Sequence, residues 1–160
     1  MINSIIVFSA GISAGILISM LILRIKAESH ILTENVSRFG MEDTEHMIAQ
    51  SAVESGWKIP KIHDLRETMQ NNGFTVQAIK VIEICKPEHA YEILSKDHER
   101  IASSLMPCRI AIYLRPDGKV YISRLNAGLI GSLMNGNIPK MMKLAAKETE
   151  EILKSTIINK

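Results

Sequence analysis

The sequence predicts an α+β protein: a two-layer domain, in which helices cover one face of an antiparallel sheet, preceded by one N-terminal transmembrane helix. Three observations lead to this fold class. Residues 4–23 form a long apolar run, β-rich segments alternate with amphipathic ones, and Pro-Asp-Gly at residues 116–118 is typical of a hairpin turn. A chain of 160 residues holds one small domain and a short extension. We therefore expect an anchor at residues 1–27 and one α+β domain at residues 28–160.

The apolar run is long enough to cross a membrane. Residues 4–23 are predominantly apolar, and at about 1.5 Å per residue they span the roughly 30 Å hydrocarbon core. A cleaved signal peptide would begin with positive charge, be shorter and end at small residues. Here no charged residue precedes Arg24, and Ile25 stands where a small residue belongs. The run therefore predicts an uncleaved single-pass anchor in contact with membrane lipid.

Small residues within the run indicate how the anchor packs. Gly11 and Gly15 form a GxxxG motif, at which another transmembrane helix can approach closely, although small residues are also common in membrane helices generally. Arg24 and Lys26 follow the run, and the positive-inside rule then favours a cytoplasmic domain. Because N-terminal anchors on small domains most often hold the domain outside the cytoplasm, we expect an extracytoplasmic, periplasmic location.

The remainder of the chain alternates between strand and helix patterns. The segments expected as strands are residues 30–37, 57–63, 74–85, 109–115 and 119–125. The segments expected as helices are residues 41–55, 65–70, 87–95 and 127–134, and a long helix that begins at Asn137.

Local signals support these assignments. Pro60 cannot donate a backbone hydrogen bond, so the segment around it is expected to be an irregular or edge strand. Asp64 is expected to cap the helix that follows it, and Pro87 occupies the first turn of another. Residues 74–85 are dense in Val and Ile and are expected to be the central strand. Gly118 supplies the positive φ that the hairpin turn requires.

The helix that begins at Asn137 has a clear amphipathic pattern, with Lys and Glu on one face. Its buried face is expected to consist of Ile138, Met141, Met142, Ala145, Thr149, Ile152 and Leu153. The helix at residues 87–95 is expected to bury Ala90, Tyr91 and Leu94. The charged run at residues 95–100 is expected to be the solvated end of that helix.

Two cysteines provide the main candidate site. Cys85 ends the expected central strand just before a helix, whose free N–H groups and dipole lower the pKa of a thiol. Cys108 begins the next long strand and has the parity of its buried residues. If the two strands are antiparallel neighbours, the two sulfurs lie close together. The alternative is that both cysteines are small buried hydrophobic residues.

His89 extends this candidate site. Its spacing from Cys85, Cys-x3-His, can supply two ligands to a soft metal, with Cys108 as a further donor. The alternative for His89 is an exposed position on a helix. Because the further donors depend on the fold, we assign no metal site and no cofactor.

Charge and motifs exclude several function classes. The net charge is +2, and outside the first 27 residues the 17 acidic residues are matched by as many basic ones. The domain therefore lacks the positive field of a nucleic-acid-binding protein. The sequence also has no P-loop, dinucleotide fingerprint, Cys-x-x-Cys pair or nucleophile elbow. We expect no nucleic-acid partner and favour a role that is not enzymatic.

Two cysteine motifs and a hairpin resemble a known family. The matching segments are Ile84-Cys85-Lys86-Pro87 with Ala90, Leu105-Met106-Pro107-Cys108-Arg109-Ile110-Ala111-Ile112-Tyr113, and Asp117-Gly118-Lys119-Val120. In this order they resemble the bacterial and archaeal family known as domain of unknown function 302, over about residues 30–155. The resemblance implies a compact two-layer α+β fold, commonly dimeric, with no established activity.

The chain departs from the family pattern at two positions. Lys86 and Arg109 stand where that pattern has Asn, so a pocket at this place would be basic at its rim and would favour an anion or a thiolate. The candidate pocket then consists of Cys85, Lys86, His89, Cys108 and Arg109.

Three functions fit these features. The first is a membrane-anchored binding or accessory module that docks on a larger, respiratory-type membrane complex through its anchor and one face of its sheet. The second is a small thiol redox or sulfur-handling protein that uses Cys85 and Cys108. The third is a metal or haem binder. A membrane-protein partner or a second copy of the chain is the expected protein partner.

Overall fold

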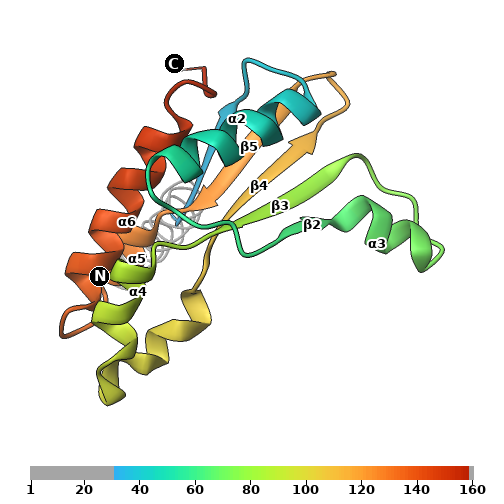
Figure 1. Ribbon diagram of the computed structural model, residues 1–160. Helices are drawn as coiled ribbons and strands as arrows, with labels where there is room; N and C mark the ends of the chain where they lie inside the picture. The colour runs from blue at the N-terminus through green and yellow to red at the C-terminus, as the bar shows by residue number, and fades with distance from the viewer. Residues whose placement is uncertain (1–30, 159–160) are drawn as a thin grey trace, which may run out of the picture. The chain divides into compact units, whose positions relative to one another are not determined.

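The computed structural model describes residues 31–158 of the chain. They form a five-stranded antiparallel sheet with helices packed against one face, as Figure 1 shows. The strands are β1 (Leu32–Val36), β2 (Ile62–Asp64), β3 (Ile79–Ile84), β4 (Cys108–Leu114) and β5 (Val120–Leu125), in the spatial order β1-β5-β4-β3-β2. The predicted α+β class with an antiparallel sheet is confirmed.

Six helices connect and cover the strands in the described residues. They are α2 (Met41–Glu54), α3 (Leu65–Asn71), α4 (Pro87–Leu94), the 3-10 helix η1 (Asp97–Leu105), α5 (Ala127–Gly131) and α6 (Ile138–Leu153). The predicted anchor at residues 4–23, with Gly11 and Gly15, lies outside the described residues. Between residues 31 and 158, no helix is both long enough and apolar enough to cross a membrane.

Alternation along the strands separates a buried face from an open face. Ile82 on β3 and Ile110 on β4 are fully buried on the face that α2 and α6 cover. The residues that alternate with the buried ones along each strand, such as Ala111 and Tyr113 on β4, point to the opposite face and are only partly buried. Within residues 31–158, no helix packs on that opposite face, which we call the open face.

Helix α6 joins two hydrophobic clusters. Its first turns contribute Ile138 and Met141 to a cluster with α4, η1 and α5. Its later turns contribute Ile152 and Leu153 to the main core, which the sheet, α2 and α6 form together. The buried residues of α6 are those that its amphipathic pattern predicts, namely Ile138, Met141, Met142, Ala145, Thr149, Ile152 and Leu153. One helix therefore fixes the sheet and the smaller helices to each other.

Two strand predictions need correction. The strand expected at residues 74–85 is β3, which begins only at Ile79. The pairing of β3 with β4 begins at Ile79, which lies opposite Tyr113, so residues 74–78 have almost no strand partner. Phe74 in this segment is 63% exposed. The central strand is β4, because β3 is followed outward by the edge strand β2. The edge position expected around Pro60 is confirmed at β2.

Two helix predictions are also wrong. On α4 the buried residue is Ile93, whereas Tyr91 is 69% exposed. The charged run expected as a solvated helix end instead begins η1, and Glu99 within it is only 2% exposed. The Glu99 carboxylate accepts a hydrogen bond of 2.9 Å from the backbone N–H of Asn137, at the start of α6. This hydrogen bond at a helix N-terminus, together with Lys96 Nζ 3.6 Å away, stabilises one oxygen of the buried carboxylate, whereas the other oxygen has no hydrogen-bond partner within the described residues.

The Glu99 contact predicts an unequal cost for two glycine substitutions. Gly136 has φ +72°, and a Cβ there would clash with the Glu99 carboxylate, whereas Gly73 has φ +82° and open space around it. We expect Gly73→Ala to lower the free energy of unfolding by about 1 kcal/mol, for the positive φ alone. Gly136→Ala should lower it by about 2–4 kcal/mol, because the side chain of Glu99 must also move. Urea unfolding of both variants measures this, and equal losses would contradict the assigned contact.

Candidate functional site

A pocket of about 470 Å³ lies at one end of the sheet. It is lined by Thr33, Ser104, Leu105, Met106, Pro107, Cys108, Arg109, Arg124, Leu125, Asn126, Ala127, Ala146, Lys147, Thr149 and Glu150, and we call it the sheet-end pocket. It lies between the two hydrophobic clusters: Leu105 and Ala127 pack against one, and Cys108 packs against the other. The pocket therefore forms where the chain passes from η1 to β4 and the two clusters separate.

Arg124 is the main charged group of the sheet-end pocket. It lies on β5 with the parity of Val120 and Ile122, so it points toward the helices, and its side chain is only 5% exposed. Its Nε donates to Glu150 Oε1 at 2.8 Å, Nη2 donates to the other oxygen of Glu150, and Nη1 donates to Asn35 Oδ1 at 2.6 Å. A buried guanidinium needs such partners, because an unpaired buried charge is very costly.

The lining of the sheet-end pocket carries more positive than negative charge. Arg109, Arg124 and Lys147 are cationic, and Glu150 is the acidic lining residue. Arg109 is 67% exposed and also lies 3.4 Å from Glu83, which is outside the pocket. Lys147 is exposed and has no ion-pair partner among residues 31–158. Arg124 is paired with Glu150 and Arg109 lies beside Glu83, so among the described lining residues Lys147 is the unpaired cation, and it favours a ligand with negative charge.

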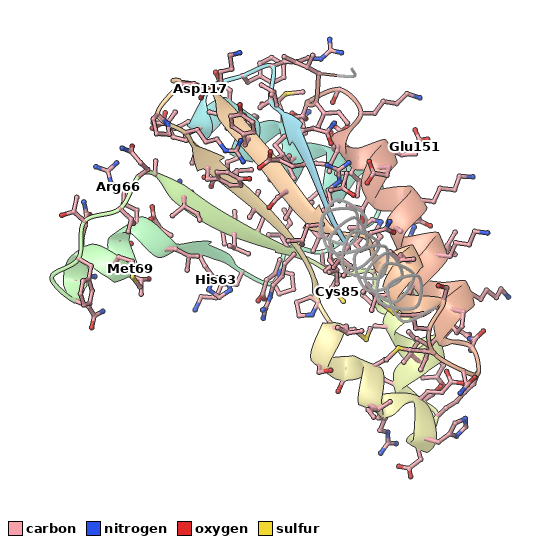
Figure 2. All side chains as sticks on the ribbon, turned by 180° about the vertical axis from the view of Figure 1, so that it is seen from behind. His63, Arg66, Met69, Cys85, Asp117 and Glu151 are labelled. Atoms are coloured by element: carbon pink, nitrogen blue, oxygen red, sulfur yellow. The ribbon has the colours of Figure 1, made fainter. Side chains whose placement is uncertain are left out.

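The two cysteines occupy neighbouring backbone positions, because β3 and β4 form the antiparallel pair on which the predicted closeness of the sulfurs depends. β3 and β4 are antiparallel neighbours, and their register places Ile84 opposite Cys108, so Cys85 is one residue beyond that pair. Cys108 packs against the main core, as its parity predicts. Cys85 lies at the end of β3 just before α4, as Figure 2 shows, and both cysteines are free thiols. Of the two, only Cys108 lines the sheet-end pocket.

The expected low pKa of Cys85 is not observed. Burial raises the pKa of the Cys85 thiol, and the charge of Glu88 raises it further. Burial also raises the pKa of Cys108 to about 11, with a further contribution from Cys85. The cations expected to stabilise a thiolate have other partners: Lys86 binds Glu148 and Arg109 lies beside Glu83. Both cysteines are therefore protonated at neutral pH.

Lys86 and His89 belong to a separate polar cluster, centred on Glu148 of α6. Glu148 Oε2 accepts hydrogen bonds from Lys86 Nζ at 2.7 Å and from Trp57 Nε1 at 2.9 Å. Glu148 Oε1 lies 3.0 Å from Nε2 of His89, whose ring stands edge-on to Trp57. We call these four residues the Glu148 cluster. Through these contacts, Trp57 after α2, Lys86 before α4 and His89 within α4 are all bound to α6.

The electrostatics of the Glu148 cluster stabilise its carboxylate. Burial alone would raise the pKa of Glu148, but the hydrogen bonds from Lys86, His89 and Trp57 outweigh burial and lower it. The His89 side chain is 17% exposed and lies against Glu148, so the exposed position expected as its alternative is not observed. Over residues 31–158, no three His, Cys, Asp or Glu side chains are grouped so as to hold a metal ion.

The structure therefore divides the predicted site. Of the five predicted residues, Cys108 and Arg109 line the sheet-end pocket, Lys86 and His89 belong to the Glu148 cluster, and Cys85 lies beside Cys108. The sequence reasoning missed Arg124, Glu148 and Glu150. For Arg124 a signal existed: Val120, Ile122 and Arg124 are alternate residues of one strand and share a face, and Arg124 is the charged residue on that otherwise apolar face. No signal identified the two glutamates, which are part of the charged face of a long helix.

The comparisons with known proteins agree with this fold. The family model described as "Domain of unknown function DUF302" matches residues 33–159. The chain belongs to this family. A solved structure, titled "Crystal structure of uncharacterized conserved protein DUF302 from Bacillus stearothermophilus", is similar with a TM-score of 0.70 and 17% sequence identity. The similarity covers 78% of this chain and 97% of that one, and at this identity it shows the fold alone. No curated protein matches the chain.

The Glu148 cluster predicts a pH-dependent contribution to stability. Because the pKa of Glu148 is lowered below its ordinary value of 4.5, its contribution is complete above that value and is lost as the pH falls through the lowered pKa. We expect Glu148→Gln to lower the free energy of unfolding by about 1–2 kcal/mol at pH 7. The difference from wild type should shrink below pH 4.5.

The matched control for this substitution is Glu151→Gln, since Glu151 is an exposed carboxylate on the outer side of α6 (Figure 2). Urea unfolding at pH 7 and at acidic pH measures both variants. A difference between wild type and Glu148→Gln that does not change with pH would contradict the assigned hydrogen bonds.

Burial of the thiols predicts slow alkylation. With a pKa of about 11, Cys108 has about one thiolate per thousand molecules at pH 8. We expect Cys85→Ser, which leaves only Cys108, and Cys108→Ser, which leaves only Cys85, to react with iodoacetamide more slowly than glutathione does. The urea-unfolded variants should react at the rate of free cysteine. Faster labelling of native Cys85 than of glutathione at pH 7 would refute this assignment.

Proposed function

We propose that this chain is a membrane-anchored binding module of the DUF302 family. In this proposal the apolar stretch at residues 4–23 holds the protein in the membrane, and the folded domain binds a small molecule in the sheet-end pocket. The domain then lies outside the cytoplasm, as expected for a small domain on an N-terminal anchor. The sheet-end pocket is the observation that carries the proposal.

The size and lining of the sheet-end pocket support ligand binding. Small-molecule sites usually measure about 300–1,000 Å³, with apolar walls and a few placed polar groups, and this pocket has about 470 Å³. Leu125 and Met106 provide apolar wall, while Arg124 provides a buried, pre-oriented cation. Because hydrogen bonds fix Arg124 in place, little ordering is needed when a ligand binds.

The open face of the sheet supports an accessory role for the same module. It carries aromatic and apolar residues, among them Tyr113, Tyr121 and Val81, beside the charged residues Glu34, Glu83 and Arg109. We propose this face as the surface that docks on a membrane-protein partner.

The thiol alternative has weaker support. A redox or sulfur-transfer thiol works as a thiolate, whereas burial raises the pKa of both Cys85 and Cys108. The closeness of the two cysteines remains in its favour. Their position at the boundary of the main core favours a packing role instead.

Native mass spectrometry of the full-length protein tests the binding proposal. Protein purified from its own membrane in mild detergent should retain a small molecule. Ser104→Phe places a large ring in the mouth of the sheet-end pocket at an exposed position, and it should remove that molecule. Ser103→Phe is the matched control, because Ser103 is also exposed but does not line the pocket. An equal loss in both variants, or no bound molecule in wild type, would overturn the proposal.

A further inference from the structure

The walls of the sheet-end pocket differ in chemistry according to the segment that supplies them. The connection from η1 to β4 supplies Leu105, Met106 and Pro107, which are apolar and partly buried. β5 and α6 supply the cations Arg124 and Lys147. A ligand that matches both parts has an apolar portion and an anionic portion.

Arg124 has hydrogen-bonding capacity left for an anion. A guanidinium has five N–H donors, and the bonds to Glu150 and Asn35 use three of them. Two donors remain on a side chain that is 95% buried, at the surface of a pocket. A carboxylate or phosphate oxygen is the acceptor that pairs best with such donors.

Lys147 supplies a second positive charge at the same pocket. It lies on the exposed side of α6, and within residues 31–158 it has no ion-pair partner. Glu150 pairs with Arg124, so that pair has no net charge and Lys147 supplies the unpaired positive charge of the pocket. A head group that accepts hydrogen bonds from the remaining Arg124 donors would therefore gain its charge attraction from Lys147.

The volume of the pocket is that of a small-molecule site. About 470 Å³ lies within the usual range of about 300–1,000 Å³ for such sites. That space holds a carboxylate or phosphate head and a short length of hydrocarbon.

β1, which supplies Thr33 to the pocket, follows the apolar stretch at residues 4–23 after only residues 24–31. A membrane is a source of molecules with this combination of head and chain.

We propose that the ligand of the sheet-end pocket is an anionic amphiphile, with a carboxylate or phosphate head bound by Arg124 and Lys147. Its hydrocarbon packs on Leu105, Met106 and Pro107. This inference rests on the proposed function, namely that the sheet-end pocket binds a small molecule, and it specifies the class of that molecule.

Calorimetry of the full-length protein in nanodiscs of zwitterionic phosphatidylcholine tests the inference. Three probes separate its parts: hexyl phosphate has head and chain, inorganic phosphate has the head alone, and hexanol has the chain alone. We expect hexyl phosphate to bind at least about tenfold more tightly than either of the others. Ser104→Phe should weaken its binding at least about tenfold, and Ser103→Phe should not.

The charge of the head group is tested on α6. Lys147→Gln should weaken hexyl phosphate binding by about fivefold, while leaving hexanol binding unchanged. Lys140→Gln is the matched control, because Lys140 is exposed on the same helix and does not line the pocket. Equal effects of the two lysine substitutions would overturn the assigned head-group contact.

The outcomes separate this inference from the proposed function. If inorganic phosphate or hexanol binds as tightly as hexyl phosphate, and Ser104→Phe blocks it, the pocket binds ligands but the amphiphile is wrong. If no probe binds while a native small molecule still co-purifies, the amphiphile is again wrong. If no probe binds and nothing co-purifies, both proposals fail.

A final arm identifies the source of the amphiphile. Adding phosphatidylglycerol to the nanodiscs should weaken the apparent binding of hexyl phosphate if a membrane lipid occupies the pocket. Unchanged binding supports a free amphiphile instead.

Discussion

The burial of one face of α6 is the constraint on which the rest of this structure depends. Ile152 and Leu153 pack under the sheet, while Ile138 and Met141 pack against α4, η1 and α5. The smaller helices contribute few buried residues of their own, and α3 contributes none. It lies apart from α2 and α6 in both views, at the β2 edge (Figures 1 and 2). Burial of apolar area is the dominant stabilising term in folding, and here one helix concentrates much of it.

The same helix supplies the polar groups that define the site. Glu148 gathers Trp57, Lys86 and His89, and Glu150 holds Arg124 in place on β5. These carboxylates lie on the flank of α6, between its buried face and solvent. Because the two hydrophobic clusters separate beside this flank, a pocket forms there whose lining is part apolar and part charged. Fold and site therefore have a common origin in the placement of one amphipathic helix.

Much of the fold could be predicted from local patterns, and much less of the site. The buried face of α6 and the parity of Cys108 follow from periodicity alone, and the structure confirms both. The site depends on which segments become neighbours, which one sequence does not reveal. Glu99 was expected to be solvated because it lies in a charged run, yet it binds the backbone at the start of α6, 38 residues away. Cys85 was expected to have a lowered pKa from the helix after it, but burial and Glu88 dominate.

The central claim is that the sheet-end pocket, rather than the cysteine pair or the open face, binds the ligand. Hydrogen-deuterium exchange of the full-length protein, with and without a lipid extract of its native membrane, tests this claim most directly. The account predicts slower exchange at residues 104–108 and 124–127, which line the pocket, and no change in α3. Unchanged exchange in both pocket segments, or protection confined to the strands of the open face, would contradict it.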